Sequence, residues 1–465
     1  MDDSFMYINS AQNLADGNGL RWLAGDGKLH PLIHFPPLFS IVLAAFEKFG
    51  LDAVFAARMV NALAFGFNII LCGLLIERFT HSQLLAILGG IIFLCSDVLI
   101  EAHSWAMSEP LFLSLYLGSL LMMVSYLKHP QRKWIIAAGV LLGLSFLTRY
   151  LGIALILAVM LTCLTAPSIP KSRRWKDLIT FAVISLLPVI LWVGYTILTI
   201  GSPTDRAFDF YLITSKQILR AFNTMLVWFI PGRLVNGHEI LWLIALVVCG
   251  ILLWLFGRKR IPPDEVAADL KTRYSLLLFL LFQFVCYIPT IFLSKSFFDP
   301  LTPLNNRILL PLLPILLVFL MLLLQFLWRN GNLIRKTGLV LCVFLLLGVY
   351  TYRATDIIPR LHENGLGFAR KSMHTSPTMA ALRTMPRTPL YSNSPYAITM
   401  WTGLPAYGIP TVDVLRQNMV DEDALLVIFD AVSLDLYDTD LTTLTQGLEK
   451  VAEYRDGTIY RLNTQ

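Results

Sequence analysis

Charged residues are scarce in this chain. Of its 465 residues, 15% are charged and 56% are apolar, whereas soluble globular domains average about 25% charged and about 45–50% apolar residues. This composition excludes a disordered chain and a string of water-soluble domains. The formal net charge of +6 is too small and too scattered for a nucleic-acid-binding surface, so no nucleic-acid partner is expected.

Disulfide frameworks and the common catalytic motifs are also missing. The 6 cysteines lie inside apolar runs and have no ligand spacing. The sequence contains no Walker A loop, Rossmann glycine fingerprint, His-Glu-x-x-His motif or nucleophile elbow. No basic segment followed by an apolar one opens the chain, so we predict no signal peptide. These absences leave a protein that uses lipid as its solvent.

Long apolar runs are abundant. A helix needs about 20 mostly apolar residues to cross a bilayer, and about ten runs meet that requirement. They are 56–78, 83–101, 105–127, 132–148, 150–166, 175–200, 238–257, 273–293, 307–328 and 333–352. The short pair 132–148 and 150–166, with Arg149 between them, is either two tilted spans or one long broken helix. The runs predict an all-α polytopic membrane protein embedded in a lipid bilayer.

Lys and Arg are unevenly distributed among the loops. If residue 1 lies outside, the inside loops hold sixteen Lys and Arg, and the outside loops between helices hold six. Because basic residues concentrate in cytoplasmic loops, we expect a multi-pass protein of the cell membrane, with the chain start and the tail extracytoplasmic. Breaking the 132–166 pair differently would invert everything before it. The inside loops in this orientation are 78–82, 128–133, 167–176, 258–273 and 329–336.

The two ends of the chain differ from the apolar middle. Residues 1–55 begin with a polar stretch that no apolar span precedes, and we expect a first helix to be missing because of a truncated or mis-called start. Residues 353–465 follow the bundle 56–352 and are predicted to form a small α/β domain outside the membrane. Short runs favour strands at 389–391, 397–401, 425–429 and 458–462, and helices at 376–385 and 441–451.

An acidic pair, Asp2 and Asp3, opens the chain. Residues 4–15 are predicted to form an amphipathic helix on the membrane surface, which would place both carboxylates at its N-terminus. A helix dipole stabilises negative charge at that end. Alternatively, the pair only caps a helix beside a free terminus.

Four motifs follow one another from this pair into the first span. They are Asp-Asp-x3-Tyr at 2–7, Asn-Leu-Ala-Asp-Gly-Asn-Gly-Leu at 13–20, Phe-Pro-Pro-Leu at 35–38 and Ala-Arg-Met-Val-Asn-Ala-Leu at 57–63. Their order resembles the first extracytoplasmic loop of the GT-C membrane glycosyltransferases, and it looks closest to the protein O-mannosyltransferase and aminoarabinose transferase group. The resemblance covers residues 1–80 and continues more loosely through 108–112, 147–150 and 306–314.

The resemblance implies a GT-C-like helical bundle and transfer of a sugar from a polyprenyl-phosphate donor. The acceptor would be a lipid, a polysaccharide or a protein on the extracytoplasmic side. In the family the first acid of the pair takes the acceptor's proton, a role that matches Asp2, with Asp3 beside it and Tyr7 as a candidate substrate-binding residue. The family's loop follows its first transmembrane helix and contains two short juxtamembrane helices, so the helix missing here would be the family's first.

Three arginines lie at the predicted outer ends of spans, namely Arg58, Arg149 and Arg307. A departing lipid phosphate needs a cation at headgroup depth, so all three are candidate substrate-binding residues. Arg307 precedes two prolines, which fits a fixed helix start. Arg307 can also be read as an interfacial anchor.

The second outside loop holds Glu109 and His103. Glu109 is a candidate to orient the acceptor or, together with His103, to hold a divalent metal. As alternatives, Glu109 and Pro110 suit the first turn of a helix, and His103 with Trp105 suits a membrane interface. No cofactor is certain, and a divalent metal stays possible.

Two other functions compete with the transferase: a transporter or flippase, and a non-catalytic envelope assembly protein. Transporters keep ionisable residues or broken helices near the bilayer midplane, often in two related halves. In this sequence the midspan positions are largely apolar, the charges gather at the outer ends, and no symmetry between halves is visible. The sequence therefore favours a glycosyltransferase.

Overall fold

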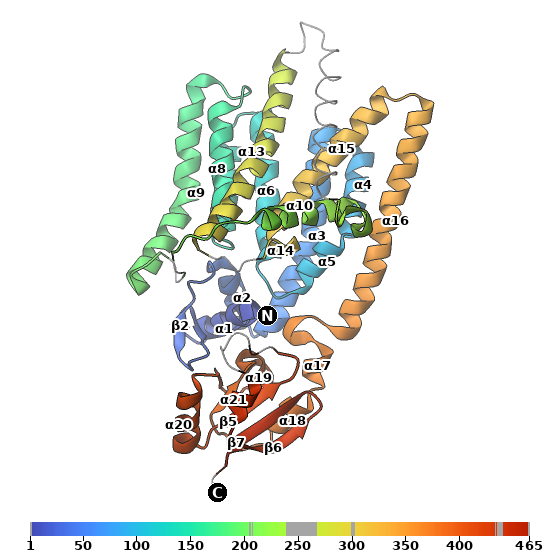
Figure 1. The fold of residues 1–465 in the computed structure, drawn as a ribbon. Coiled ribbons are helices and arrows are strands. Elements are labelled where there is room, and N and C mark those ends of the chain that lie inside the picture. The colour runs from blue at the N-terminus through green and yellow to red at the C-terminus, as the bar shows by residue number, and fades with distance from the viewer. Residues whose placement is uncertain are drawn as a thin grey trace. The chain divides into compact units, whose positions relative to one another are not determined.

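The computed structural model describes residues 2–203, 206, 208–238, 267–298, 303–432, 434 and 440–463, which form two compact units (Figure 1). Unit 1 comprises residues 1–32, 40–57 and 359–465, and unit 2 comprises residues 33–39 and 58–358. The predicted fold class is confirmed, because the chain is mostly helical and has a small C-terminal sheet. The predicted segment boundaries at 55 and 352 stay a prediction.

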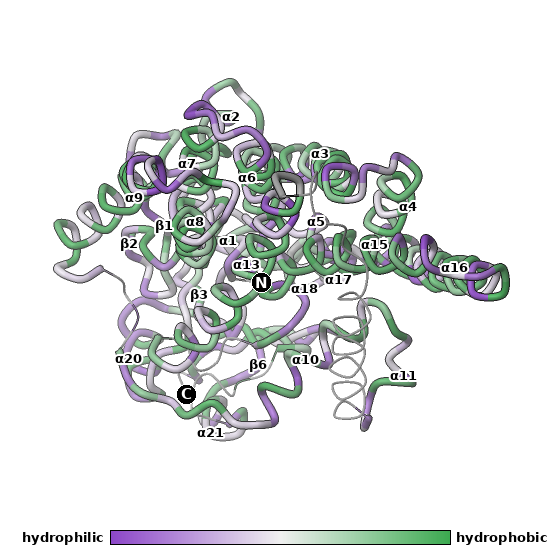
Figure 2. The backbone as a smooth tube through the Cα atoms, turned by 90° about the horizontal axis from the view of Figure 1, so that it is seen from above, coloured by the Kyte–Doolittle hydropathy of each residue, from purple (hydrophilic) through white to green (hydrophobic). Residues whose placement is uncertain are grey.

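Unit 2 is a bundle of apolar helices, and Figure 2 shows their hydrophobic colouring. Among the described residues six helices are long and apolar enough to cross a membrane, or seven if one bent pair counts as a span. The predicted span 238–257 lies outside the described residues beyond His238. The helices are α3 (Ala53–Thr80), α4 (Gln83–Leu94), α5 (Asp97–Ser104), α6 (Glu109–Lys128), α7 (Arg132–Phe146), α8 (Gly152–Thr165), α9 (Lys171–Ile200), α10 (Ser215–Phe229), α11 (Gly232–Val235), α13 (Ala267–Phe297), α14 (Asn306–Leu309), η1 (Leu310–Leu312), α15 (Leu313–Asn330) and α16 (Leu333–Asn364).

One predicted span is bent in the structure, and the pair of runs whose form was left open is resolved. The run 83–101 is bent by 55° between α4 and α5. The bend follows from Ser96, whose side chain accepts a hydrogen bond from the backbone N–H of Leu99 and so starts a new helix. The run 132–166 consists of two helices, α7 and α8, joined by a tight turn in which the N–H of Gly152 donates to the carbonyl of Arg149 at 2.9 Å.

Small residues let α7 and α9 approach closely. A Cβ atom on Gly143 would lie 3.0 Å from the Pro188 Cγ and 3.1 Å from the Ser185 carbonyl oxygen, and one on Gly139 would lie 3.1 Å from Ile184. Glycines four residues apart give neighbouring membrane helices this kind of contact. The packing fixes the last turn of α7, which leads into Arg149.

Unit 1 contains a five-stranded sheet with the order β4-β3-β5-β7-β6. The strands β4, β3 and β5 are parallel, whereas β7 runs antiparallel to both β5 and β6. The elements of this unit are α1 (Asp2–Ala15), β1 (Arg21–Leu23), β2 (Leu29–Pro31), α2 (Leu38–Lys48), η2 (Gly367–Ala369), α17 (Lys371–His374), α18 (Pro377–Leu382), β3 (Leu390–Ser392), α19 (Pro395–Thr402), β4 (Ala406–Gly408), α20 (Val412–Glu422), β5 (Leu425–Phe429), α21 (Leu441–Thr445), β6 (Leu448–Tyr454) and β7 (Gly457–Leu462).

The tail predictions are partly wrong. The runs 389–391, 425–429 and 458–462 contain strands, but 397–401 lies in helix α19. Pro395 occupies the first turn of α19 and Gly403 ends it at φ 71°, the residue types that favour a helix start and a helix end. The predicted helix 441–451 stops at Thr445, and the chain then pairs with β7 as a strand.

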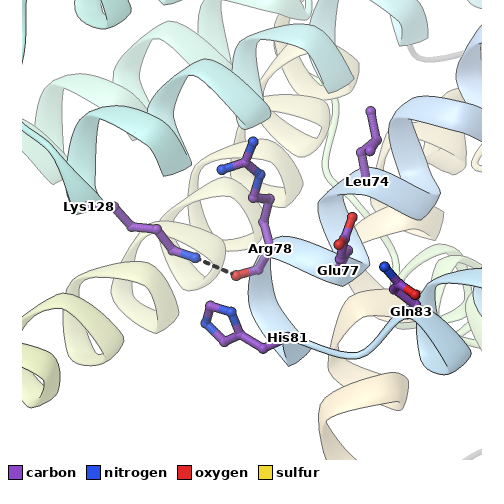
Figure 3. Close-up of a pocket in the computed structure, with 6 residues that line it drawn as sticks. All are labelled: Leu74, Glu77, Arg78, His81, Gln83 and Lys128. Atoms are coloured by element: carbon purple, nitrogen blue, oxygen red, sulfur yellow. Dashed lines mark hydrogen bonds between the residues drawn. The ribbon is translucent and has the colours of Figure 1, made fainter.

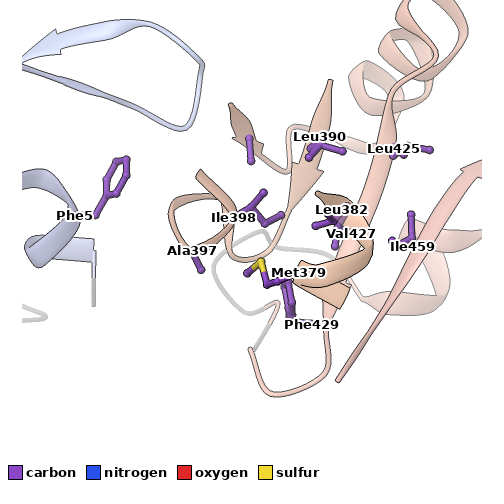
Figure 4. Close-up of a cluster of buried hydrophobic side chains, with 11 residues drawn as sticks. Phe5, Met379, Leu382, Leu390, Ala397, Ile398, Leu425, Val427, Phe429 and Ile459 are labelled. Carbon is purple, nitrogen blue, oxygen red and sulfur yellow. The ribbon is translucent and has the colours of Figure 1, made fainter. Parts of the chain in front are cut away.

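Both faces of this sheet are covered. Leu425, Val427 and Phe429 of β5 face one apolar cluster (Figure 4). Leu426 and Ile428 face a second cluster on the other side. Alternate residues of a strand point to opposite faces, so an unbroken apolar strand fits a sheet packed on both sides.

The N-terminal helix α1 contributes to the first of these clusters. The Phe5 side chain is 3% exposed, and its ring stacks on Tyr396 with centroids 5.0 Å apart. The hairpin β1–β2 joins the same unit, because the N–H of Gly408 donates to the carbonyl of Gly25 at 2.8 Å. Helix α1 contains the predicted helix 4–15. Part of its apolar face packs on the C-terminal sheet.

Candidate functional site

The candidate site of unit 2 is centred on Glu109, the first residue of α6. Glu109 is 3% exposed, and its Oε1 atom contacts the Nη1 of Arg149 and the Nε of Arg307. Among the described residues the buried Oε2 atom has no hydrogen-bond partner. Pro110 follows in the first turn, where its missing N–H costs the helix nothing. The N-terminal end of α6 adds a positive dipole to the two guanidinium groups.

Arg149 lies in the tight turn between α7 and α8. Its own N–H donates to the Ser145 carbonyl at 3.0 Å. The neighbouring Tyr150 hydroxyl donates to the Ile33 carbonyl at 2.7 Å and accepts from the Trp192 indole N–H at 3.1 Å. These bonds tie the turn to α9 and to the segment 33–39, so the position of the Arg149 backbone is fixed.

Arg307 lies on the short helix α14, where the predicted span is broken. The Asn305 side chain caps this helix, and Pro311 and Pro314 each begin a new helical segment in η1 and α15. The Tyr287 hydroxyl of α13 donates to the Ile308 carbonyl at 2.8 Å. The start of the helix that carries Arg307 is therefore anchored, as the two prolines predict.

The three side chains leave a net charge of +1, because one carboxylate faces two guanidinium groups. Their side chains are 4% exposed for Glu109, 14% for Arg149 and 34% for Arg307, so the charge is mostly removed from bulk water. A guanidinium has five N–H donors in a planar fork that suits phosphate oxygens. The arrangement can therefore bind an anion, above all a phosphate.

Four other predicted residues lie on helices α1 and α3. Arg58 is exposed in the second turn of α3, and no described ion pair links it to Glu109. Tyr7 is 1% exposed inside unit 1, where its carbonyl accepts the Ser40 hydroxyl at 3.1 Å. Asp2 is the first residue of α1, and Asp3 is half-buried beside it. Their catalytic and binding roles stay predictions.

The geometry does not support a metal at His103. Its Nε2 atom accepts from the Asn68 side-chain amide at 3.0 Å, and its Nδ1 atom donates to the Leu99 carbonyl at 2.7 Å, so both ring nitrogens are engaged. Over the part of the chain that the structure describes, no three His, Cys, Asp or Glu residues are grouped so that they could hold a metal ion. Glu109 is paired with two arginines.

Sequence reasoning did not single out Asn68 and gave Asn61 only as part of a motif. Both lie on α3, are almost fully buried, and hold the segment that leads into Glu109. The Asn61 side chain donates to the carbonyls of Trp105 and Met107, and the Asn68 side chain donates to that of Pro110 at 3.1 Å. Two amides seven residues apart in an apolar span were a readable signal, because a polar side chain there needs a partner.

The fold and the site define a multi-pass membrane protein with a cationic, partly buried cluster at one end of its bundle. Residues 34–192 match the family described as dolichyl-phosphate-mannose-protein mannosyltransferase. A comparison with curated protein sequences finds no match.

Two solved structures have a similar fold over nearly the whole chain. ArnT from Cupriavidus metallidurans, bound to undecaprenyl phosphate, is 14% identical with a TM-score of 0.56, and the match covers 100% of this chain and 95% of that one. The Archaeoglobus fulgidus oligosaccharyltransferase, in complex with zinc and sulfate, is 12% identical with a TM-score of 0.55 and is covered to 69%, against 99% of this chain. The predicted resemblance to GT-C membrane glycosyltransferases is confirmed for the fold by these two structures, and the family match supports it over residues 34–192.

Proposed function

We propose that this chain transfers a sugar from a polyprenyl-phosphate-linked donor to a lipid, glycan or protein acceptor on the extracytoplasmic face of a cell membrane. The observation that carries the proposal is the net positive charge of the Glu109 cluster, where two arginines share one buried carboxylate. A lipid phosphate is an anion at the depth of a span end, which is where this cluster lies on α6. The undecaprenyl phosphate bound to ArnT supports this class of donor.

The proposed reaction inverts the configuration of the sugar. An acceptor oxygen attacks the anomeric carbon, and the bond from that carbon to the phosphate oxygen breaks, so its electron pair leaves with polyprenyl phosphate. Asp2 accepts the acceptor's proton as general base, and Asp3 and Tyr7 belong to the same motif. Arg149 and Arg307 donate to the leaving phosphate and stabilise its charge. Arg58 is a further candidate for that phosphate.

The distribution of basic residues supports the orientation. With sixteen Lys and Arg in one set of loops and six in the other, the positive-inside rule places Glu109 at the outer end of α6 and Lys128 at its inner end. We therefore propose that the donor phosphate reaches Arg149 and Arg307 from the extracytoplasmic leaflet.

Release of polyprenyl phosphate by the full-length protein tests the proposal. The purified chain is incubated with labelled polyprenyl-phospho-hexoses or polyprenyl-phospho-pentoses and membrane extract. We expect at least one donor to yield free polyprenyl phosphate. A general base contributes about 10²–10⁴-fold to a rate. Asp2→Asn should therefore lower the rate of sugar transfer by about that factor and leave donor binding intact. Full activity in that variant would remove Asp2 from the role.

The arginines allow a sharper test, because removing one of them leaves a balanced pair. Arg149→Gln keeps Glu109 opposite Arg307, so the protein should fold while donor affinity falls about tenfold, the effect of one lost charge-assisted hydrogen bond. Lys216→Gln, an exposed change on α10, is the matched control and should have no effect. If no donor releases polyprenyl phosphate, the transferase proposal fails and a transporter or assembly protein is favoured.

A further inference from the structure

A second polar site lies at the end of the bundle opposite to Glu109. Helix α6 begins at Glu109 and ends at Lys128, which places the two residues about 30 Å apart at 1.5 Å per residue. Around the second end is a pocket of about 620 Å³ (Figure 3). It is lined by Leu74, Glu77, Arg78, His81, Gln83 and Lys128. The residues come from the end of α3, the turn into α4 and the end of α6.

The pocket has an excess of positive charge. The Lys128 ammonium donates to the Arg78 carbonyl at 2.7 Å, which fixes this cation beside the Arg78 residue. Figure 3 shows Lys128 reaching toward Arg78 from α6. The lining has two basic side chains, Arg78 and Lys128, against one carboxylate, Glu77, so its formal charge without His81 is +1. Such a lining attracts an anion and also offers acceptors at Glu77 and Gln83.

An exposed apolar stripe on α3 leads into the pocket. Leu63, Phe67, Ile70 and Leu74 are exposed by 68%, 52%, 60% and 43%. Their spacing of four, three and four residues places them on one face of the helix, and Arg78 continues that face four residues later. From Leu63 to Leu74 the stripe is about 16 Å long, roughly half of a hydrocarbon core of about 30 Å. It therefore spans about one leaflet.

We propose that this pocket binds the phosphate of an anionic phospholipid, with an acyl chain lying along the α3 stripe. Arg78 and Lys128 take the phosphate diester, and Glu77 and Gln83 accept hydrogen bonds from headgroup hydroxyls. Basic pockets between membrane helices bind anionic headgroups in this manner. Leu74 belongs to both the stripe and the pocket lining, so one ligand can occupy both. A soluble phosphate shares the headgroup chemistry but does not need the stripe.

Lipid retention measured by native mass spectrometry tests the proposal on the full-length protein. The protein is titrated in detergent with phosphatidylglycerol or with phosphatidylcholine of the same acyl chains. We expect phosphatidylglycerol to bind at least tenfold more tightly. Arg78→Gln and Lys128→Gln should each weaken phosphatidylglycerol binding about tenfold. The control is Lys176→Gln, which changes an exposed cation near the N-terminus of α9 and should leave binding unchanged. Equal binding of both lipids, or an equal loss in the control variant, would overturn the site.

Two further arms separate a lipid from a free anion. Ile70→Ser changes the stripe without touching the pocket lining, and it should weaken phosphatidylglycerol severalfold. Inorganic phosphate added as a competitor should displace the lipid poorly. If inorganic phosphate binds the wild-type protein and displaces phosphatidylglycerol completely, and Ile70→Ser has no effect, the pocket is a soluble-anion site and the lipid proposal is wrong. Each variant should elute from a size-exclusion column at the same volume as the wild type, which establishes that it is folded and that the loss of lipid binding is local.

Discussion

Phe5→Ala should destabilise unit 1, although residue 5 lies far in sequence from the sheet that it supports. The Phe5 side chain is 3% exposed and belongs to the cluster that contains Val427 and Phe429 of β5. A Phe side chain buries about 150–250 Å², which at about 25 cal/mol per Å² corresponds to about 4–6 kcal/mol. Measured costs of Phe→Ala changes in protein cores are about 3–5 kcal/mol. We therefore expect a loss of about 3–5 kcal/mol.

Hydrogen exchange in the full-length protein measures this loss. Each 1.36 kcal/mol changes an equilibrium tenfold, so the β5 amides should exchange roughly two to four orders of magnitude faster in Phe5→Ala. Phe49→Ala removes a ring of the same unit that is 87% exposed, and it should leave these amides unchanged. Amides of α6 in unit 2 provide an internal reference.

The stacked partner provides a second check. The rings of Phe5 and Tyr396 meet at an interplanar angle of 26°, and such aromatic pairs are coupled by about 0.5–1.5 kcal/mol. A double-mutant cycle with Tyr396→Ala should return a coupling in that range. If Phe5→Ala accelerates exchange in α1 but leaves β5 unchanged, then α1 is not part of the domain core and the reasoning is refuted.

Two further predictions concern packing and pH. Gly143→Ala should lower the melting temperature, because its Cβ would press on α9; overpacking of this kind costs about 1–3 kcal/mol. Gly194 has open space around it, so Gly194→Ala should raise the free energy of unfolding by up to about 1 kcal/mol. Burial and the Asp52 carboxylate raise the pKa of Glu47, so its ionisation costs stability at neutral pH. Glu47→Gln should therefore raise the melting temperature of unit 1 at pH 7, with no gain below about pH 4, where the carboxyl is protonated in both states; Glu449→Gln, an exposed change, should do neither.

The helices were predictable because hydrophobicity is a local property of the sequence. Each predicted span within the described residues contains a helix or a bent pair of helices, and the arginines at span ends were candidates from position alone. The pairing was not predictable, because Arg307 and Glu109 are 198 residues apart. No local pattern specifies which two helix ends meet across a bundle. The partner of the amphipathic helix α1 was hidden for the same reason, since periodicity reveals an apolar face and not what covers it.

The error in the tail has a different physical cause. Residues 397–401 read as Ala-Ile-Thr-Met-Trp, a run whose apolar, β-branched and aromatic residues favour a strand. The residues on either side favour a helix instead, because Pro395 lies in its first turn and Gly403 ends it in the left-handed region. Turn chemistry outside the run therefore outweighed the propensity inside it.

A second buried carboxylate in the bundle provides a comparison for Glu109. Asp177, at the other end of the bundle, is 1% exposed, accepts the Tyr126 hydroxyl at 2.7 Å and pairs with Arg173 at 3.3 Å. One arginine and one hydrogen bond thus suffice to hold a buried acid in this bundle. Glu109 contacts two arginines, so these three side chains by themselves carry a charge of +1. We propose that the ligand of this cluster is a lipid phosphate, because at the end of a membrane span it is an anion of the right chemistry and depth.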